Sequence, residues 1–206
     1  MQPYEELEQK FGQFLGVDNV VACSSGTAAL HLALEALQLP PGSQVLVPDL
    51  CMVACARAVV LAGLEPVFID CDDSLNMNYM LVEEALSSVG AETIRACLVV
   101  HTYGRRANMA CFPWLHDVAM IEDMAELHGI PPHKDDWSQT DVACWSFFKN
   151  KTIHGEEGGA VSFPQKRNYA DRARSLRSLG FTEAHDFTHT PRGHNYRLAN
   201  LLATPI

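Results

Sequence analysis

The sequence predicts an α/β protein in which a mostly parallel sheet of seven strands is sandwiched by helices. Three observations predict this class: short apolar runs alternate with helical patterns, the early runs are almost continuously apolar, and 48% of the 206 residues are hydrophobic. Strands that are covered on both faces carry apolar side chains on both sides, and strand–helix alternation is typical of parallel sheets. We expect residues 1–206 to form one large domain.

The expected strands are apolar runs bounded by turn residues. They lie at 19–23, 44–48, 66–70, 95–101, 118–122, 141–147 and 159–163. The expected helices lie at 4–15, 26–38, 52–62, 78–88 and 167–179. Gly or Pro follows the end of each helix within a few residues, as at Gly16, Pro40 and Gly180, and these residues stop helices.

The net charge of −10 is distributed unevenly along the chain. Residues 1–164 carry 8 Lys and Arg against 22 Asp and Glu, whereas residues 165–206 carry 7 against 3. The excess of acidic residues in segment 1–164 argues against nucleic acid as a partner. The basic segment either faces an anion, or is a solvated helix face or an oligomer contact; both interpretations stay open at this point.

Composition also bears on compartment and on metal binding. No apolar run approaches the roughly 20 residues of a membrane-spanning helix, and the acidic N-terminus is unlike a secretory signal. Seven cysteines, most of them in apolar runs, are typical of a reducing compartment. We therefore expect a cytoplasmic protein with no membrane partner. Cys51 and Cys55 have no second ligand pair, so we predict no metal site.

Polar residues follow several expected strands at their carboxyl ends, where sheets of this type bind ligands. Segment 24–27 (SSGT) follows the first strand and opens the helix at 26–38. Free N–H groups at a helix start attract anions such as phosphate, although a Ser or Thr cap is also ordinary there. Ser146 ends the sixth strand.

Asp123 and Lys151 are the candidate reactive residues at this edge of the sheet. Asp123 follows an apolar strand; it is either a helix cap or a buried carboxylate that keeps a heterocyclic nitrogen protonated, as pyridoxal phosphate chemistry requires. Lys151 follows the sixth strand in semi-apolar surroundings, where a lysine can form a Schiff base. A lysine in a loop is more often merely solvated, and Lys149 is a local competitor. His101, His128 and His154 are expected to be hydrogen-bonded structural residues.

Together these segments resemble the DegT/DnrJ type of sugar aminotransferase, a pyridoxal-phosphate family with the aspartate-aminotransferase fold (fold type I). The resemblance extends over nearly the whole chain and rests on several motifs in the same order. They are SSGTAAL at 24–30, HTYG at 101–104, EDMAE at 122–126, SFFKNKTI at 146–153 and GHNYR at 193–197. The NKTI segment most resembles the perosamine-synthase branch.

The resemblance implies a role for each site residue. Lys151 would be the Schiff-base lysine and the acid/base, and Asp123 would pair with the pyridine nitrogen. The other residues that it implies are Gly26, Thr27 and Ser146 at the phosphate, Glu126 near the cofactor hydroxyl, Met52 where the family carries an aromatic ring stacked on the cofactor, and Asn195 at the phosphate of a neighbouring subunit. A homodimer with shared sites is therefore expected.

The implied reaction transfers an amino group, usually from glutamate, to a nucleotide-linked 4-keto-6-deoxy sugar. Family members are commonly much longer, and we expect a C-terminal small domain to be absent from residues 1–206. One alternative is therefore a non-catalytic remnant that binds the cofactor or dimerises. Another is a dehydratase or lyase reaction on the same fold, although Lys151 argues against the branch in which histidine replaces this lysine.

Overall fold

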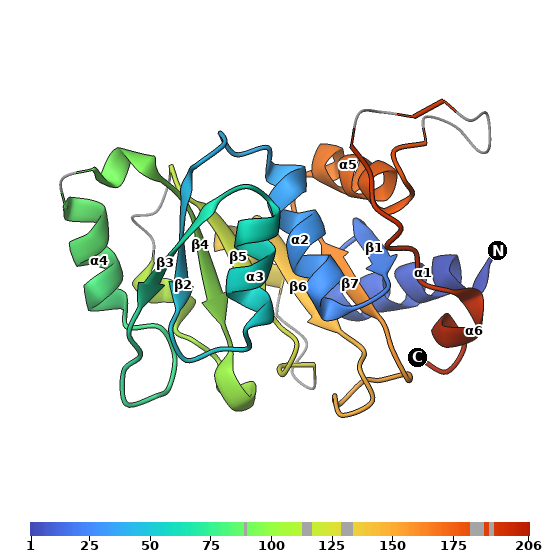
Figure 1. Cartoon of the computed structure of the whole chain (residues 1–206). Helices are drawn as coiled ribbons and strands as arrows, with labels where there is room; N and C mark the ends of the chain where they lie inside the picture. The colour runs from blue at the N-terminus through green and yellow to red at the C-terminus, as the bar shows by residue number, and fades with distance from the viewer. Residues whose placement is uncertain (89, 113–116, 129–133, 182–187, 190–191) are drawn as a thin grey trace.

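A sheet of seven strands forms the centre of the structure, a computed structural model (Figure 1). It describes residues 1–88, 90–112, 117–128, 134–181, 188–189 and 192–206. The strands are β1 (Val20–Cys23), β2 (Gln44–Pro48), β3 (Glu65–Ile69), β4 (Ile94–Val100), β5 (Ala119–Asp123), β6 (Val142–Ser146) and β7 (Gly159–Ser162). Each predicted strand is present, with ends that differ from the prediction by at most one residue.

The helices are α1 (Pro3–Leu15), α2 (Gly26–Leu37), α3 (Ala54–Leu61), α4 (Tyr79–Ser87), α5 (Arg167–Arg177) and α6 (Asn200–Ala203). The first five are predicted to within two residues at each end, whereas no sequence pattern predicts the four-residue α6. Within the described part of the chain, no helix has the length and apolar character needed to cross a membrane.

The strands lie in the order β1-β7-β6-β5-β4-β2-β3. β7 is antiparallel to both of its neighbours, and the remaining pairs are parallel. Six strands therefore end at the same edge of the sheet. The predicted fold class, a mostly parallel seven-stranded sheet sandwiched by helices, is confirmed; the reversed direction of β7 is the feature that the apolar pattern did not predict.

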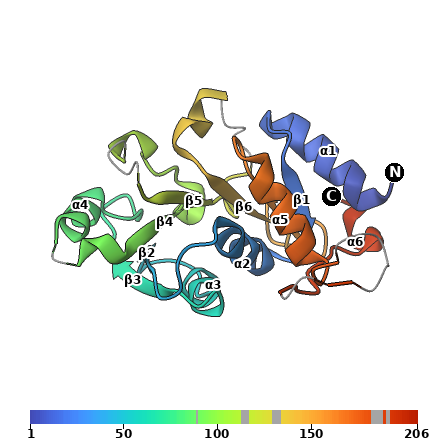
Figure 2. The same cartoon turned by 90° about the horizontal axis from the view of Figure 1, so that it is seen from above.

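Helices cover both faces of the sheet, as Figure 2 shows for α2 and α3 on one side and α1 and α4 on the other. Alternate residues of a strand point to opposite faces. Val45 and Val47 accordingly pack with α2, α3 and α5, whereas Leu46 packs with α4. At the other end of the sheet, α1 and α6 bury Ala143 and Trp145. Burial on both faces explains why the strands read as continuous apolar runs.

Helix α2 is buried almost all around and begins in contact with β7. Ser25 caps it, because its hydroxyl accepts a hydrogen bond from the backbone N–H of Ala28 at 3.1 Å. A Cβ atom on Gly159 would lie 2.4 Å from the carbonyl oxygen of Ser25. Only glycine therefore allows β7 to begin this close to the start of the helix.

Basic residues of the C-terminal segment tie α5 to the body of the chain. The guanidinium of Arg177 donates to Glu8 at 2.6 Å and to the carbonyl of Ala22 at 2.7 Å. Arg172 and Arg174 donate to backbone carbonyls of α2 and β1 at 2.5 and 3.0 Å. These three arginines thus make contacts inside their own chain. Neither of the two roles considered from the sequence, facing an anion or forming a solvated face or oligomer contact, describes such contacts.

Replacing Arg177 by Met should lower the free energy of unfolding by about 3–5 kcal/mol, because it leaves the Glu8 carboxylate partly buried without its cation. The side chains of Arg177 and Glu8 are 9% and 15% exposed. Urea titration of Arg177→Met measures this loss. Arg167→Met on the same helix is the control, because that side chain is 85% exposed and should change stability by less than about 0.5 kcal/mol. Equal effects of the two substitutions would contradict a structural role of the buried pair.

Candidate active site

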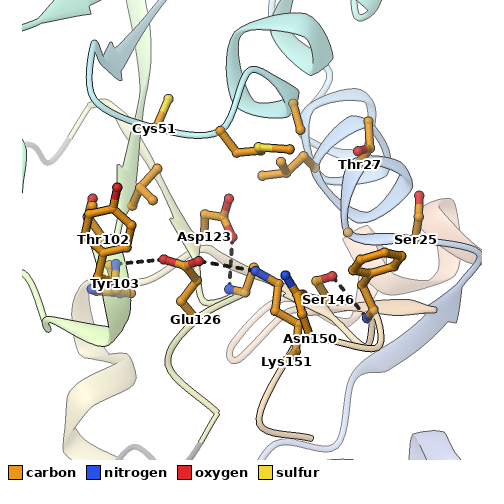
Figure 3. Close-up of a pocket in the computed structure, with 18 of the residues that line it drawn as sticks. Ser25, Thr27, Cys51, Thr102, Tyr103, Asp123, Glu126, Ser146, Asn150 and Lys151 are labelled. Atoms are coloured by element: carbon orange, nitrogen blue, oxygen red, sulfur yellow. Dashed lines mark hydrogen bonds and ion pairs between the residues drawn. The ribbon is translucent and has the colours of Figure 1, made fainter. Parts of the chain in front are cut away.

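A pocket of about 550 Å³ lies at the sheet edge where the parallel strands end (Figure 3). Its walls come from the start of α2, the turn before α3, the ends of β4, β5 and β6, and the loop that follows β6. Seven of the eight predicted site residues line it: Gly26, Thr27, Met52, Asp123, Glu126, Ser146 and Lys151. Asn195 is the exception. The strand-end reasoning from the sequence thus locates the pocket.

Asp123 is the last residue of β5 and is only 8% exposed. One of its carboxylate oxygens accepts a hydrogen bond from the N–H of Ala125 at 3.0 Å, and the other accepts from the thiol of Cys55 at 3.3 Å. Burial raises the pKa of the Asp123 carboxyl, while these hydrogen bonds and the nearby positive charge of Lys151 oppose that shift. A cation placed beside Asp123 would therefore be strongly favoured.

The helix-cap interpretation of Asp123 is wrong in its detail. Residues 124–128 form a turn and not a helix, so the bond from Ala125 caps a turn. This turn carries Glu126 back over the pocket, next to Lys151 (Figure 3).

Lys151 points into the pocket and lies beside Glu126. Its Nζ atom is 3.4 Å from one carboxylate oxygen of Glu126, and the other oxygen accepts from the backbone N–H of Tyr103 at 2.7 Å. The side chain of Lys151 is 18% exposed. Lys149, by contrast, is exposed, is absent from the pocket lining and lies over the ring of Phe148. The geometry therefore favours Lys151 over Lys149 as the candidate Schiff-base lysine. Sequence spacing alone did not distinguish the two residues.

The start of α2 meets the end of β6 at the pocket wall. A Cβ atom on Gly26 would lie 2.8 Å from Cβ of Ser146, so the two backbones are in close contact. Gly26, Thr27 and Ser146 consequently lie together, and the first N–H groups of α2 have no partner within the helix. With the positive end of the helix dipole, this corner is suited to a phosphate or another anion.

Met52 lies on the rim of the pocket with 72% of its surface exposed. The predicted helix 52–62 begins two residues later, at Ala54, so Met52 belongs to the turn before α3. An exposed thioether over an open pocket is available to pack on a planar ligand.

The sequence profile of the DegT/DnrJ/EryC1/StrS aminotransferase family matches residues 2–204. The chain belongs to this family. Similar relatives include the GDP-perosamine synthase of Caulobacter vibrioides, which is 35% identical over 204 residues, 96% of this chain and 53% of that protein. The dTDP-3-amino-3,4,6-trideoxy-alpha-D-glucose transaminase of Streptomyces venezuelae is 32% identical over 209 residues, 98% of this chain and 53% of that protein.

Among solved structures of the family's fold, NtdA from Bacillus subtilis with bound cofactor PMP matches with a TM-score of 0.89 and 25% identity, over 100% of this chain and 47% of that one. The prediction of the family and of its fold is confirmed. The chain spans about half the length of the relatives that it matches.

Asn195, which belongs to the family's GHNYR-like segment, lies away from the pocket of its own chain. Its side chain is exposed, its backbone forms an isolated bridge with Ser178, and its amide oxygen accepts from Arg197 at 3.4 Å. This position is open to a second molecule, and the predicted contact with a neighbouring subunit stays a prediction.

The sequence did not predict the supporting roles of two residues in the site. Cys55, whose thiol contacts Asp123, comes from α3, so no local motif connects the two residues. Tyr103, whose N–H holds Glu126, has a φ of 54°, which is unusual for a residue with a side chain. Gly104 directly follows it, and that glycine was the available signal for a tight, strained turn.

His101, which belongs to the pocket lining, and His128, which does not, are both hydrogen-bonded, as predicted. Nδ1 of His101 accepts from the N–H of Ala107 at 3.1 Å, and its Nε2 is 2.8 Å from the buried carboxylate of Glu122. Nδ1 of His128 accepts from the N–H of Ile153 at 3.1 Å, which holds the loop that carries Lys151. Burial lowers the pKa of His128 to about 4, and the charge of Lys151 adds to that effect. His154 is exposed.

The depressed pKa of His128 predicts acid sensitivity. In the unfolded chain a histidine binds its proton near pH 6.5, whereas His128 in the folded chain does so near pH 4. Between these values the unfolded state binds more protons, so stability should fall by up to about 1 kcal/mol per unit as pH drops from 6.5 toward 4.

Urea unfolding of wild type and His128→Asn at several pH values measures this contribution. Asparagine keeps an acceptor for the N–H of Ile153 but does not titrate, so its curve should be flatter in this pH window. The exposed residue His154, changed to Asn, provides the matched control and should follow wild type. Parallel curves for wild type and His128→Asn would show that another group causes the acid sensitivity.

Proposed function

We propose that residues 1–206 form the cofactor domain of a pyridoxal-phosphate-dependent aminotransferase that moves an amino group from glutamate to a nucleotide-linked 4-keto-6-deoxy sugar. One observation carries the proposal: a buried carboxylate, Asp123, and a lysine, Lys151, line one pocket that also holds the start of a helix. Family membership supports the reaction class. The relative named GDP-perosamine synthase supports the substrate class.

The residues of the pocket fit this cofactor. Asp123 is buried, and among the ion pairs of the described residues none involves it, so a cation beside it would stabilise the ionised carboxylate. A protonated ring nitrogen would be that cation. The corner of Gly26, Thr27 and Ser146 offers N–H and hydroxyl donors for a phosphate, and Gly26 has no side chain to fill it.

When bound, pyridoxal phosphate supplies a ring that takes up negative charge from the carbon next to the transferred nitrogen. The part of Asp123 is to hold a proton on the ring nitrogen by remaining ionised beside it, which overcomes the rise that burial causes in the pKa of this carboxyl. Its bonds from Ala125 and Cys55 fix the direction of the carboxylate.

The start of α2 would hold the phosphate. Backbone N–H groups of Gly26 and Thr27, the hydroxyls of Thr27 and Ser146, and the helix dipole all favour negative charge there. Because Gly159 and Gly26 fix this corner through close backbone contacts, the donors are arranged before any ligand arrives.

Lys151 would move the proton. Its Nζ atom would hold the cofactor and, once free, would accept the proton from the α-carbon of the amino donor. In the second half of the reaction, the same amine would deliver a proton to the sugar carbon that receives the amino group. Glu126 orients this amine at 3.4 Å and is itself fixed by the N–H of Tyr103. Met52 would cover one face of the ring from the rim.

We further propose a homodimer in which Asn195 reaches the site of the second subunit. The exposed position of Asn195 outside its own pocket supports this arrangement. We also propose a cytoplasmic location, and the seven free cysteines support it, because disulfides are rare in reducing compartments.

Reduction with borohydride in the presence of pyridoxal phosphate should attach the cofactor to Lys151 and to no other lysine. Peptide mapping by mass spectrometry locates the label. Lys149→Ala, two residues away and outside the pocket, should keep the label, whereas Lys151→Ala should lose it. Label that is scattered over surface lysines in a folded chain would overturn the cofactor assignment.

Transamination should require glutamate, a nucleotide-linked 4-keto-6-deoxy sugar and Lys151 together. Mass spectrometry of the products tests this with the chain loaded with pyridoxal phosphate. Asp123→Asn should lower the rate by at least about a hundredfold, because a neutral amide cannot hold the ring proton. Conversion of the sugar without glutamate would indicate a dehydratase or lyase instead. Cofactor binding at Lys151 without turnover of any donor would indicate a binding module.

A further inference from the structure

Three metal-ligating side chains meet at the far side of α2, outside the pocket. His31 and Glu35 lie one turn apart on α2, and His194 comes from the C-terminal segment. One ligand atom from each residue lies within 4.8 Å of the others. Nε2 of His194 is 2.7 Å from one carboxylate oxygen of Glu35, and Nε2 of His31 is 3.8 Å from the other. None of the three lines the cofactor pocket.

His31 has an unsatisfied nitrogen that faces this cluster. The residue is 4% exposed, and no group meets its Nε2 atom with the distance and angle of a hydrogen bond, although the backbone of Leu61 lies near the ring. The separation of 3.8 Å from Glu35 is too long for a hydrogen bond. A buried polar atom without a partner costs free energy, and such atoms are uncommon in folded proteins. A bound ion would satisfy Nε2 of His31.

We propose that His31, Glu35 and His194 bind a divalent transition-metal ion of the zinc type. Two imidazoles and one carboxylate are a common zinc ligand set, with a water molecule in the fourth position. Ligand atoms around tetrahedral zinc are about 3.3 Å apart, so small side-chain rotations bring the three groups into range. Spacing of four residues places both α2 ligands on one helix face.

The surroundings of the cluster also suit a metal. The hydroxyl of Tyr196 is 3.1 Å from Nδ1 of His31, and a partner at the second ring nitrogen leaves Nε2 free for a metal. The ring of Tyr196 stacks on His194 with centroids 4.8 Å apart and fixes its orientation. His194 is 27% exposed, which provides an entry path.

The second cluster of this kind in the described residues does not carry the same inference. Asp49, Asp70 and Cys71 gather near the sheet edge, but the two carboxylates are exposed to water. Exposed acidic groups are solvated by water, whereas Nε2 of His31 is buried without a hydrogen-bond partner.

A metal at this site would connect the C-terminal segment to α2. Gly193 already packs so closely on the turn that follows α5 that a Cβ atom there would lie 2.1 Å from the carbonyl carbon of Leu179. His194 directly precedes Asn195, so the ion would also fix the backbone next to that exposed amide. The proposed ion would thus link two segments of the chain, and its site lies outside the pocket.

Titration of the metal-free full chain with Co²⁺, with and without pyridoxal phosphate, tests the site. We expect one ion per chain and weak visible absorption bands, without the intense near-ultraviolet band that cysteine thiolates give. Zn²⁺ at a hundredfold excess over its dissociation constant should raise Tm by roughly 5–10 °C. A thiolate band, or no change in absorption and Tm, would overturn the proposal.

His194→Gln and Glu35→Gln should each abolish the Co²⁺ bands and the Zn²⁺-dependent rise in Tm. His154→Gln is the matched control, because this exposed histidine lies outside the cluster and should keep both signals. His194 is the less buried of the two histidine ligands, so its replacement is the variant best suited to keep the fold. A folded His194→Gln protein that binds Co²⁺ as wild type does would refute the ligand assignment.

Discussion

The close backbone contact of α2 with the ends of β6 and β7 is the constraint on which the site depends. Gly159 and Gly26 allow this contact because neither carries a side chain. It brings the positive end of a helix to the edge where Asp123 ends the neighbouring β5. Any side chain at position 159 would move the helix away from the sheet, and the anion corner and the carboxylate would no longer border one pocket.

The polar groups of the pocket are held by hydrogen bonds from the residues around them. Asp123 is fixed by a thiol from α3 and by its own turn, and Glu126 is fixed by the backbone of Tyr103. The loop of Lys151 is anchored through Ile153 on a buried histidine. Such support matters, because catalytic groups that are fixed in advance lose little entropy when a ligand binds.

Much of the fold could be predicted, because strands buried on both faces leave a strong apolar signal and glycines mark where helices end. The place of Asp123 and Lys151 followed from the rule that parallel strands end at one edge. Pairs such as Cys55 with Asp123, or Glu35 with His194, could not be predicted, because these residues are distant in sequence and local patterns carry no information on such contacts. The direction of β7 could not be predicted either, because an apolar run looks the same whichever way the strand runs in the sheet.

The pairing of β1 has a consequence for how the chain folds during synthesis. β1 is an edge strand whose neighbour in the sheet is β7. Val20 can therefore pair with its partner Ser162 only after Ser162 has been synthesised. At ribosomal rates of about 5–20 residues per second, the first strand stays unpaired for roughly 7–30 seconds. Helix α1, which packs beside it, also gains its ion pair with Arg177 only later. The apolar residues of β1 therefore remain without their strand partner until β7 has been synthesised.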